Sequence, residues 1–182
     1  MKKIFLITIC VLLLSSFVDA QITKYRKINE KGIANMVFSN KAIPKGQESS
    51  VTLKNSFSSG EAIYARCYFP KPFGQYNVSS NEDFFIDLYL DGKFVERKKM
   101  LHPDADWDQI SLYVLNTGDD DFKNLEIALN NAGSGTHTLQ VSVGFEKYNT
   151  TKKVVNSDGT IENKDVFNAV YISDGKIEIN VK

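Results

Sequence analysis

Cysteine and histidine are scarce in this sequence, which argues against several kinds of site. The chain of 182 residues holds two cysteines and two histidines. Cys10 lies in the apolar N-terminal stretch, so Cys67 is alone in the rest of the chain and cannot form an internal disulfide. A zinc site needs about three or four such ligands, which two histidines and one thiol do not clearly supply. Cys67 alternates with apolar residues, a pattern that favours a small buried core side chain.

Motifs for nucleophilic catalysis are also missing. The sequence contains no Gly-x-Ser-x-Gly turn, which would expose a serine nucleophile. His137 falls on the apolar face of a strand pattern and is expected to be structural, while His102 has carboxylates beside it but no matched nucleophile. We therefore do not expect an enzyme, although carboxylates distant in the sequence could still meet for glycoside hydrolysis.

The chain has no excess of charge of either sign. Lysine and arginine number 22, as do aspartate and glutamate, so the formal net charge at pH 7 is zero. Nucleic acids and anionic membranes attract proteins that carry a basic patch or a large positive charge. The composition therefore gives no reason to expect nucleic acid as a partner.

An apolar run lies at the N-terminus and is too short to anchor the chain. Lys2 and Lys3 precede an apolar stretch at residues 4–18, and the small residue Ala20 follows. A membrane-spanning helix needs about 20 such residues. A positive start, an apolar middle and a small residue at the end are typical of a cleaved secretory signal peptide. We expect residues 1–20 to be removed and the protein to be secreted, periplasmic or at the cell surface, without spanning a membrane.

The rest of the chain predicts one β domain. Residues 21–32 are polar and lysine-rich and are interpreted as a loosely held N-terminal arm, and residues 33–182 have the length of a single well-cored domain. Short runs that alternate between apolar and polar residues are typical of half-buried strands. Such runs occur at 33–38, 50–57, 61–69, 84–90, 93–98, 109–115, 138–145, 166–172 and 176–181.

Turn signals separate these runs. Asp91-Gly92, between two strand-like runs, predicts a two-residue hairpin turn. Residues 147–165 are expected to form a loop or a minor hairpin that turns at Asp158-Gly159. The last two runs form either a closing hairpin or one strand bent at a glycine bulge. Residues 125–129 fit both a strand and a helix, and we favour a strand because of the neighbouring strands.

Short strands without a persuasive helix favour an all-β fold, an antiparallel two-sheet sandwich with the N-terminal arm attached. Three segments, Gly60–Arg66, Leu88–Lys93 and Gly135–Val141, resemble strand signatures of immunoglobulin-like modules, including those of macroglobulin-type proteins. The resemblance extends over residues 33–182 at the superfamily level and lacks the cysteine pair that bridges the sheets of antibody domains. It implies an immunoglobulin-like sandwich with an interaction role and names no partner.

Aromatic residues provide the first candidate site. Flat rings on the outward face of a sheet can carry a binding surface for a protein or a glycan. The alternative is that these rings only stabilise cross-strand pairs or pack under loops. The candidate ligand-binding residues are Tyr64, Tyr68, Phe85, Tyr89, Tyr113 and Trp107.

An acidic loop at residues 102–108 provides the second candidate site. Asp104, Asp106 and Asp108 stand at alternate positions, as carboxylates do at the start of a calcium-binding loop. The pattern then fails, because Gln109 replaces the glycine expected at the sixth position and Leu115 the acidic residue at the twelfth. The sequence implies no cofactor apart from this Ca²⁺ ion. The alternative is that residues 102–108 form a solvated acidic turn without an ion. Asp119, Asp120 and Asp121 could add ligands if their turn meets the loop at residues 102–108.

These patterns lead to one functional hypothesis and two alternatives. The hypothesis is a secreted or periplasmic, non-catalytic binding or structural module that recognises a protein or glycan partner. The first alternative is an extracellular hydrolase that uses the carboxylates of residues 102–108. The second is a calcium-stabilised subunit of a surface assembly.

Overall fold

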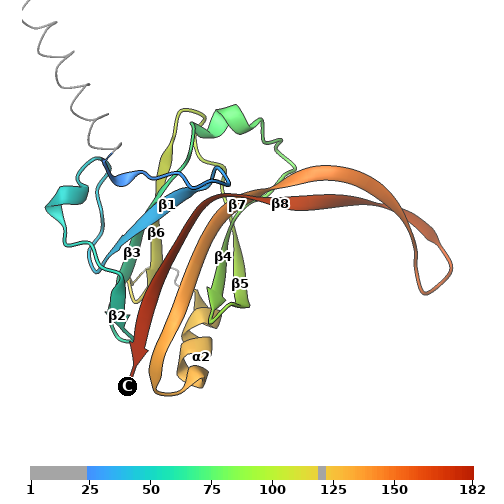
Figure 1. The fold of residues 1–182 in the computed structure, drawn as a ribbon. Helices are drawn as coiled ribbons and strands as arrows, with labels where there is room; N and C mark the ends of the chain where they lie inside the picture. The colour runs from blue at the N-terminus through green and yellow to red at the C-terminus, as the bar shows by residue number, and fades with distance from the viewer. Residues whose placement is uncertain (1–23, 119–121) are drawn as a thin grey trace, which may run out of the picture.

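The computed structural model describes residues 24–118 and 122–182 (Figure 1). The expected signal peptide at residues 1–20 and the acidic residues 119–121 lie outside this part of the chain. The strands are β1 (Ala34–Ser39), β2 (Ser56–Ser58), β3 (Ile63–Tyr68), β4 (Phe84–Leu90), β5 (Lys93–Met100), β6 (Gln109–Leu115), β7 (Gly135–Val155) and β8 (Ile161–Val181). The helical elements are α2 (Lys123–Ala132) and the short 3₁₀ turns η1 (Glu48–Ser50) and η2 (Phe73–Tyr76).

The strands form one curled, mixed sheet. Their order is β5-β4-β7-β8-β1-β3-β6, and β2 pairs with β8 beside this path. Most neighbours are antiparallel, but β1 and β2 each run parallel to β8. The all-β class is therefore supported, whereas the antiparallel sandwich of two sheets is not confirmed. In the parallel pairs, strands from the early part of the chain lie beside β8, the last strand. Local alternation of apolar and polar residues does not reveal contacts over such a sequence separation.

The curl of the sheet encloses a single hydrophobic core. Ile86 of β4 and Val143 of β7, from one half of the sheet, join the same cluster as Cys67 of β3 and Leu112 of β6 from the other half. Cys67 is fully buried, as the sequence predicts, and burial raises the pKa of its thiol far above the usual value. Because burial outweighs the opposing effect of the neighbouring Arg66, the thiol stays protonated and unreactive.

Helix α2 corrects the strand expected at residues 125–129. Phe122, Leu125 and Leu129 have helical spacing, and all three are buried at one end of the core. The residues between them are mostly exposed, as expected of an amphipathic helix packed on one side. The helix contacts β4 and β5, and the chain leaves it through Gly133, whose φ is +81°. The strand prediction was wrong because five residues were too few to separate the two periods.

One other element differs from expectation, whereas the two predicted turns and the single-strand alternative for the last two runs are confirmed. The strand expected at residues 50–57 is reduced to β2, and η1 precedes it. The predicted hairpin at Asp91-Gly92 is confirmed, with positive φ at both residues, and so is the turn at Asp158-Gly159. The two last runs form one continuous strand, β8, which pairs with β7 from Gly135 to Val155.

Strands β7 and β8 extend far beyond the body of the protein as a two-stranded hairpin (Figure 1). Within the body, β4 pairs with residues 139–145 of β7, while β1 and β2 pair with residues 173–180 of β8. We call residues 149–168 the hairpin arm. None of the described helices is both long and apolar enough to cross a membrane.

Candidate binding sites

The six aromatic candidates do not gather on one face. The expectation of an exposed ring is wrong for Tyr68 and Phe85, which are fully buried. Tyr68 donates a hydrogen bond to Glu48 Oε1 at 2.9 Å, and the Phe85 ring lies 3.6 Å under the Arg97 guanidinium. Both residues do point away from the core side of the sheet, but other chain segments cover that face. Alternation alone gives the direction of a side chain and not what lies above it.

The remaining four rings lie in three places. Tyr64 and Tyr113 form an edge-to-face pair across β3 and β6, with ring centroids 5.6 Å apart, which is the cross-strand role weighed above. Trp107 is 41% exposed in the loop between β5 and β6. Tyr89 stands on β4, in a polar hollow described below.

The structure does not bring the acidic loop together as a metal centre. Asp108 instead pairs with Arg26 of the N-terminal segment, with 2.9 Å between Nη1 and Oδ2. The loop is fixed to the segment before it by backbone bonds, since Phe73 donates to Trp107 O and Phe69 donates to Asp108 O. Within residues 24–118 and 122–182, no three His, Cys, Asp or Glu side chains lie close enough to hold a metal ion.

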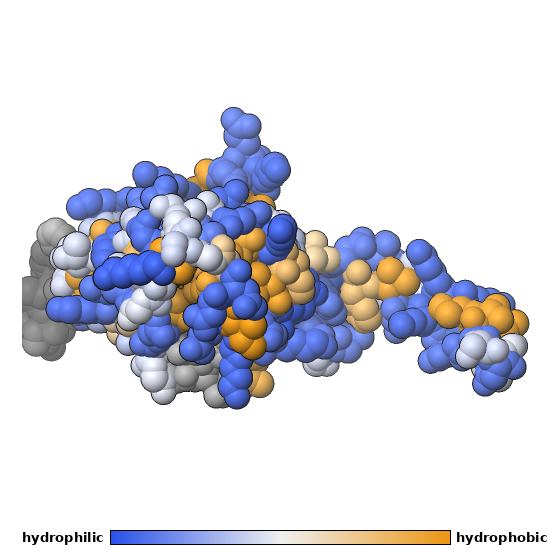
Figure 2. Space-filling view, turned by 90° about the horizontal axis from the view of Figure 1, so that it is seen from below, coloured by the Kyte–Doolittle hydropathy of each residue, from blue (hydrophilic) through white to orange (hydrophobic). Residues whose placement is uncertain are grey.

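The hairpin arm exposes apolar side chains far from the core. Every residue from 148 to 165 is exposed. Val155 and Ile161 pair across the strands next to the turn, and each is 68% exposed. Figure 2 shows hydrophobic surface near the end of the arm and a second hydrophobic stretch closer to the body, with hydrophilic surface between the two. The sequence predicts the turn at Asp158-Gly159 but no site here, because the arm has no long apolar alternation.

The arm also leaves hydrogen-bonding groups without strand partners. No described strand pairs with β7 beyond Phe145 on its outer side, or with β8 before Ser173 on its outer side. Lys152 lies directly opposite Lys164, and like charges in such a position destabilise a strand pair. At the base, Glu82 anchors the arm by accepting the Tyr148 N–H at 2.8 Å.

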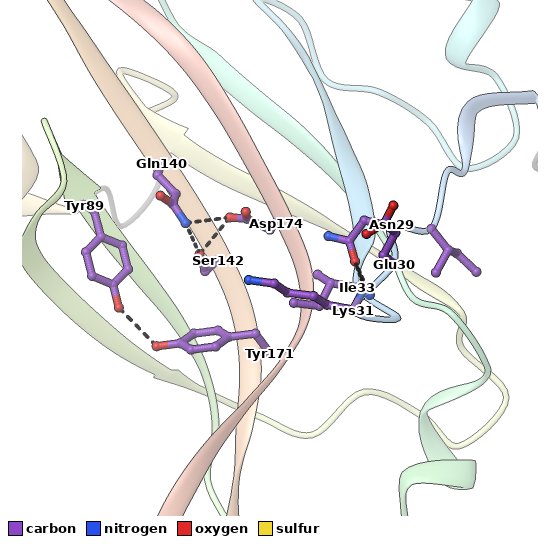
Figure 3. A pocket seen from close by; sticks show the side chains of 10 residues that line it. Asn29, Glu30, Lys31, Ile33, Tyr89, Gln140, Ser142, Tyr171 and Asp174 are labelled. Atoms are coloured by element: carbon purple, nitrogen blue, oxygen red, sulfur yellow. Dashed lines mark hydrogen bonds between the residues drawn. The ribbon is translucent and has the colours of Figure 1, made fainter.

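A polar hollow of about 680 Å³ lies on the outer face of β4, β7 and β8 (Figure 3). The strand register places Asp87, Ser142 and Asp174 side by side on three neighbouring strands. Ser142 donates to Asp174 Oδ1 at 2.9 Å, and Gln140 Nε2 donates to the same oxygen at 3.0 Å. Residues 28–33 of the N-terminal segment form the opposite wall. These groups are thus held in fixed positions before any ligand arrives.

A buried charge pair supports the floor of the hollow. Arg97 donates to both carboxylate oxygens of Asp87, at 2.7 and 2.8 Å, and to Glu146 at 3.1 Å. The Tyr171 hydroxyl donates to Asp87 at 2.7 Å and lies 3.1 Å from the Tyr89 hydroxyl. Burial, followed by these hydrogen bonds, raises the pKa of Tyr171 well above its usual value, while the bonds to Asp87 raise the pKa of Arg97. The Tyr171 phenol therefore acts as a neutral hydrogen-bonding group.

Sequence reasoning found Tyr89 and missed the residues around it. Gln140 and Ser142 were recognised only as the polar positions of an alternating strand. Tyr171 and Asp174 lie 29 to 34 positions after Gln140 and Ser142 in the chain and meet them only through the β7–β8 pairing. A polar residue on the solvent side of a strand carries no signal by itself, so these positions could not have been selected.

Comparisons with known proteins leave the chain without an assigned family. No protein-family model and no curated protein sequence matches it. Among solved structures, a CARDB domain from Pyrococcus furiosus, determined in complex with di-metal ions, matches with 6% sequence identity and a TM-score of 0.28. That match covers 86% of this chain and 94% of the other. At this TM-score the likeness establishes neither a shared fold nor a shared function.

Proposed function

We propose that this protein is an exported, non-catalytic binding module that engages a protein partner through its hairpin arm. The observation that carries the proposal is the arm itself, a two-stranded ladder in which every residue from 149 to 165 is exposed. An isolated hairpin is at best marginally stable in water, because two strands cannot bury a hydrophobic face. The arm is 20 residues long and has valine and isoleucine next to its turn. Contact with another molecule would bury these side chains and stabilise the hairpin.

A protein is the partner that best matches the chemistry of the arm. Its two open edges offer backbone N–H and C=O groups, which an added strand would satisfy. Natural proteins usually protect such edges with charges, prolines or covering loops. Here charged residues of both signs, Lys152, Lys153 and Lys164 with Asp158, Glu162 and Asp165, discourage uncontrolled pairing, and a carboxylate of the partner beside Lys152 and Lys164 would relieve their repulsion. The all-β fold is compatible with the immunoglobulin-like superfamily, whose members mostly bind, space or support.

Removal of the arm tests the proposal. The mature chain, residues 21–182, is compared with a variant in which residues 150–166 are replaced by Asn-Gly. Both are incubated with the extracellular or envelope fraction of the source cells and treated with a lysine-reactive cross-linker. We expect cross-links from Lys152, Lys153 or Lys164 to a defined partner, whose recovery falls at least tenfold with the truncated variant.

A double variant, Val155→Ser with Ile161→Ser, serves as the matched control, since it keeps the length and charge of the arm. It should lower partner recovery without changing the circular dichroism of the body. Equal capture of the same partner by the intact and truncated chains would overturn the proposal.

The polar hollow favours a second candidate function, the binding of a glycan. Its Gln140, Ser142 and Asp174 side chains are already positioned by mutual hydrogen bonds. Little side-chain entropy would therefore be lost when a hydroxyl-rich ligand binds. Tyr89 and Tyr171 add aromatic surface beside them. A glycan array on the mature chain would support this candidate if binding is lost in Gln140→Ala and kept in the arm-truncated variant. An array without binding would reject it.

A further inference from the structure

The curled sheet stops short of a closed barrel, leaving a seam between its two end strands. In the described chain, β5 pairs with β4 alone and β6 with β3 alone. A groove of about 580 Å³ lies at this seam, with Met100 on the β5 side and residues 109–111 on the β6 side. A smaller hollow of about 170 Å³ shares Met100 and Ser111 with it and reaches Lys98 and Tyr113. We call the two together the seam groove, and along it the edge of β6 has no strand partner.

Buried polar atoms without partners face this groove. Gln109 is 2% exposed, yet neither its amide nitrogen nor its amide oxygen has a hydrogen-bond partner. Arg66 is 5% exposed, and its Nε is also without a partner, although another nitrogen of the group donates to Ile43 O. Both residues line the groove. Buried polar groups are rarely left unsatisfied, because each costs its full desolvation penalty.

The rim of the groove is apolar and cationic. Leu101 is 92% exposed and Trp107 is 41% exposed, and both line it. Lys45 brings a positive group to the rim, and the buried Arg66, whose charge is partly offset by Glu48, brings a second beneath it, against the single lining carboxylate of Asp104. Exposed apolar side chains gathered around buried unsatisfied groups are typical of a binding site rather than of free surface.

We propose that the seam groove binds an extended peptide segment of a partner protein, which adds to the free edge of β6. A peptide group carries one N–H and one C=O, which match the acceptor and the donor of the Gln109 amide, and a second carbonyl can accept from Arg66 Nε. Apolar side chains of the segment lie on Leu101 and Trp107, and an acidic residue lies near Lys45 and Arg66. Strand addition of this kind satisfies an open sheet edge while pockets select alternate side chains.

This choice follows from the two kinds of group present. A glycan would not use the open backbone edge of β6, and a lipid would leave Gln109 and Arg66 unsatisfied. The proposal does not rest on the function proposed for the arm, since the seam groove lies on β5 and β6.

The experiment selects binders from a phage-displayed library of random 12-residue peptides on the mature chain. Recovered peptides are synthesised and titrated by fluorescence anisotropy. We expect enriched sequences in which apolar residues alternate and an acidic residue recurs. Hydrogen exchange with bound peptide should slow the amides of residues 109–113.

The variant Gln109→Leu separates binding from folding. Loss of the buried amide should weaken peptide binding at least tenfold, while the melting temperature stays within about 2 °C of the original or rises, because an unsatisfied polar group has been removed. A merely structural Gln109 would instead lower the melting temperature. Ile127→Ser, at an exposed position of α2 outside the groove, is the control and should bind normally.

Three results would overturn the proposal. They are a selection that enriches no peptide, peptides that bind Gln109→Leu as well as the original chain, and peptides that protect residues other than those of β6. The arm-truncated variant should bind the peptides unchanged, so failure of the arm proposal and failure of this one are distinguishable.

Discussion

At the scale of single residues, Asp87 shows how a sheet can bury a charge on the side turned away from its core. Its carboxylate is 1% exposed and receives three hydrogen bonds of 2.7–2.8 Å, two from Arg97 and one from Tyr171. Phe85 beneath the guanidinium and Glu146 beside it complete the surroundings of the cation. The floor of the polar hollow is thus rigid because every member of this group has a partner.

Substitution of Asp87 should therefore destabilise the protein more than an ordinary surface change. Asp87→Ala leaves the Arg97 charge half-buried without its main partner, and we expect a loss of about 2–3 kcal/mol in the free energy of unfolding. Urea denaturation followed by tryptophan fluorescence measures it. Asp87→Asn keeps the shape and some hydrogen bonds and should cost less; equal costs would mean that the charge pair contributes nothing.

His137 and Asp91 give the hairpin between β4 and β5 a dependence on pH. His137 Nδ1 donates to Asp91 Oδ2 at 2.8 Å, and Nε2 lies 3.1 Å from Gly133 O. Both ring nitrogens act as donors only in the imidazolium form, so the hydrogen bond to Asp91, followed by the one to Gly133, raises the pKa of His137. The stabilisation should be complete below the unfolded pKa of about 6.5 and be lost as the pH rises through the higher folded value.

An NMR titration of the imidazole checks this expectation directly. The midpoint should lie above 6.5, and Asp91→Asn should move it down. A midpoint at or below 6.5 in the intact protein would contradict the assigned hydrogen bonds, as would an unchanged midpoint in Asp91→Asn.

At the scale of elements, the close crossing of β8 over β1 depends on Gly175. A Cβ at this position would lie 2.7 Å from Phe38 Cε2 and 2.9 Å from Met36 Cβ. Because both neighbours are core residues, Gly175→Ala should cost about 1–3 kcal/mol through overpacking. Thermal melting measures the loss. Gly60→Ala is the matched control, since a Cβ there meets nothing within 4 Å, and a similar loss in both variants would refute the steric explanation.

How far the sequence predicts each element depends on where its partners lie. The β4–β5 hairpin was predicted because Asp91-Gly92 fixes the turn and both strands locally. Helix α2 was one of two interpretations of residues 125–129, and the strand was favoured because of the neighbouring strands, although Phe122, Leu125 and Leu129 have helical spacing. The hairpin arm was underestimated because its strands bury no face, so the usual alternation is absent. The parallel pairing of β1 with β8 spans almost the whole chain and leaves no local trace.

The same reasoning applies to the candidate sites. Trp107 and Tyr89 were selected as aromatic residues in exposed-looking positions, and each lies in a distinct hollow. In the sequence, Gln109 is a mismatch to a calcium loop and the first residue of the strand run at 109–115. Its buried, unpartnered amide is visible only once β3, β6 and the loop at residues 101–108 are folded together. Unsatisfied hydrogen-bonding groups are a property of the fold and leave no pattern in sequence.

At the scale of the whole molecule, the protein divides into a cored body and an arm that shares its two longest strands. Residues 139–145 of β7 pair on one side with β4 and on the other with β8, and their apolar side chains are buried in the core. Residues 149–155 of the same strand pair with β8 alone and bury nothing. Stability along one strand should therefore change sharply near Tyr148, where Glu82 accepts the backbone N–H.

Amide hydrogen exchange of the free protein should reveal this boundary. Amides of residues 139–145 need global unfolding to exchange, whereas those of residues 149–155 need only the arm to open, so we expect protection factors that differ by at least about 100-fold between the two halves of β7. Replacing residues 150–166 by Asn-Gly should change the free energy of unfolding of the body by less than about 1 kcal/mol, since no core contact is lost. Uniform protection along β7 would mean that the arm is stable without a partner, and the main reason for assigning it a binding role would be gone.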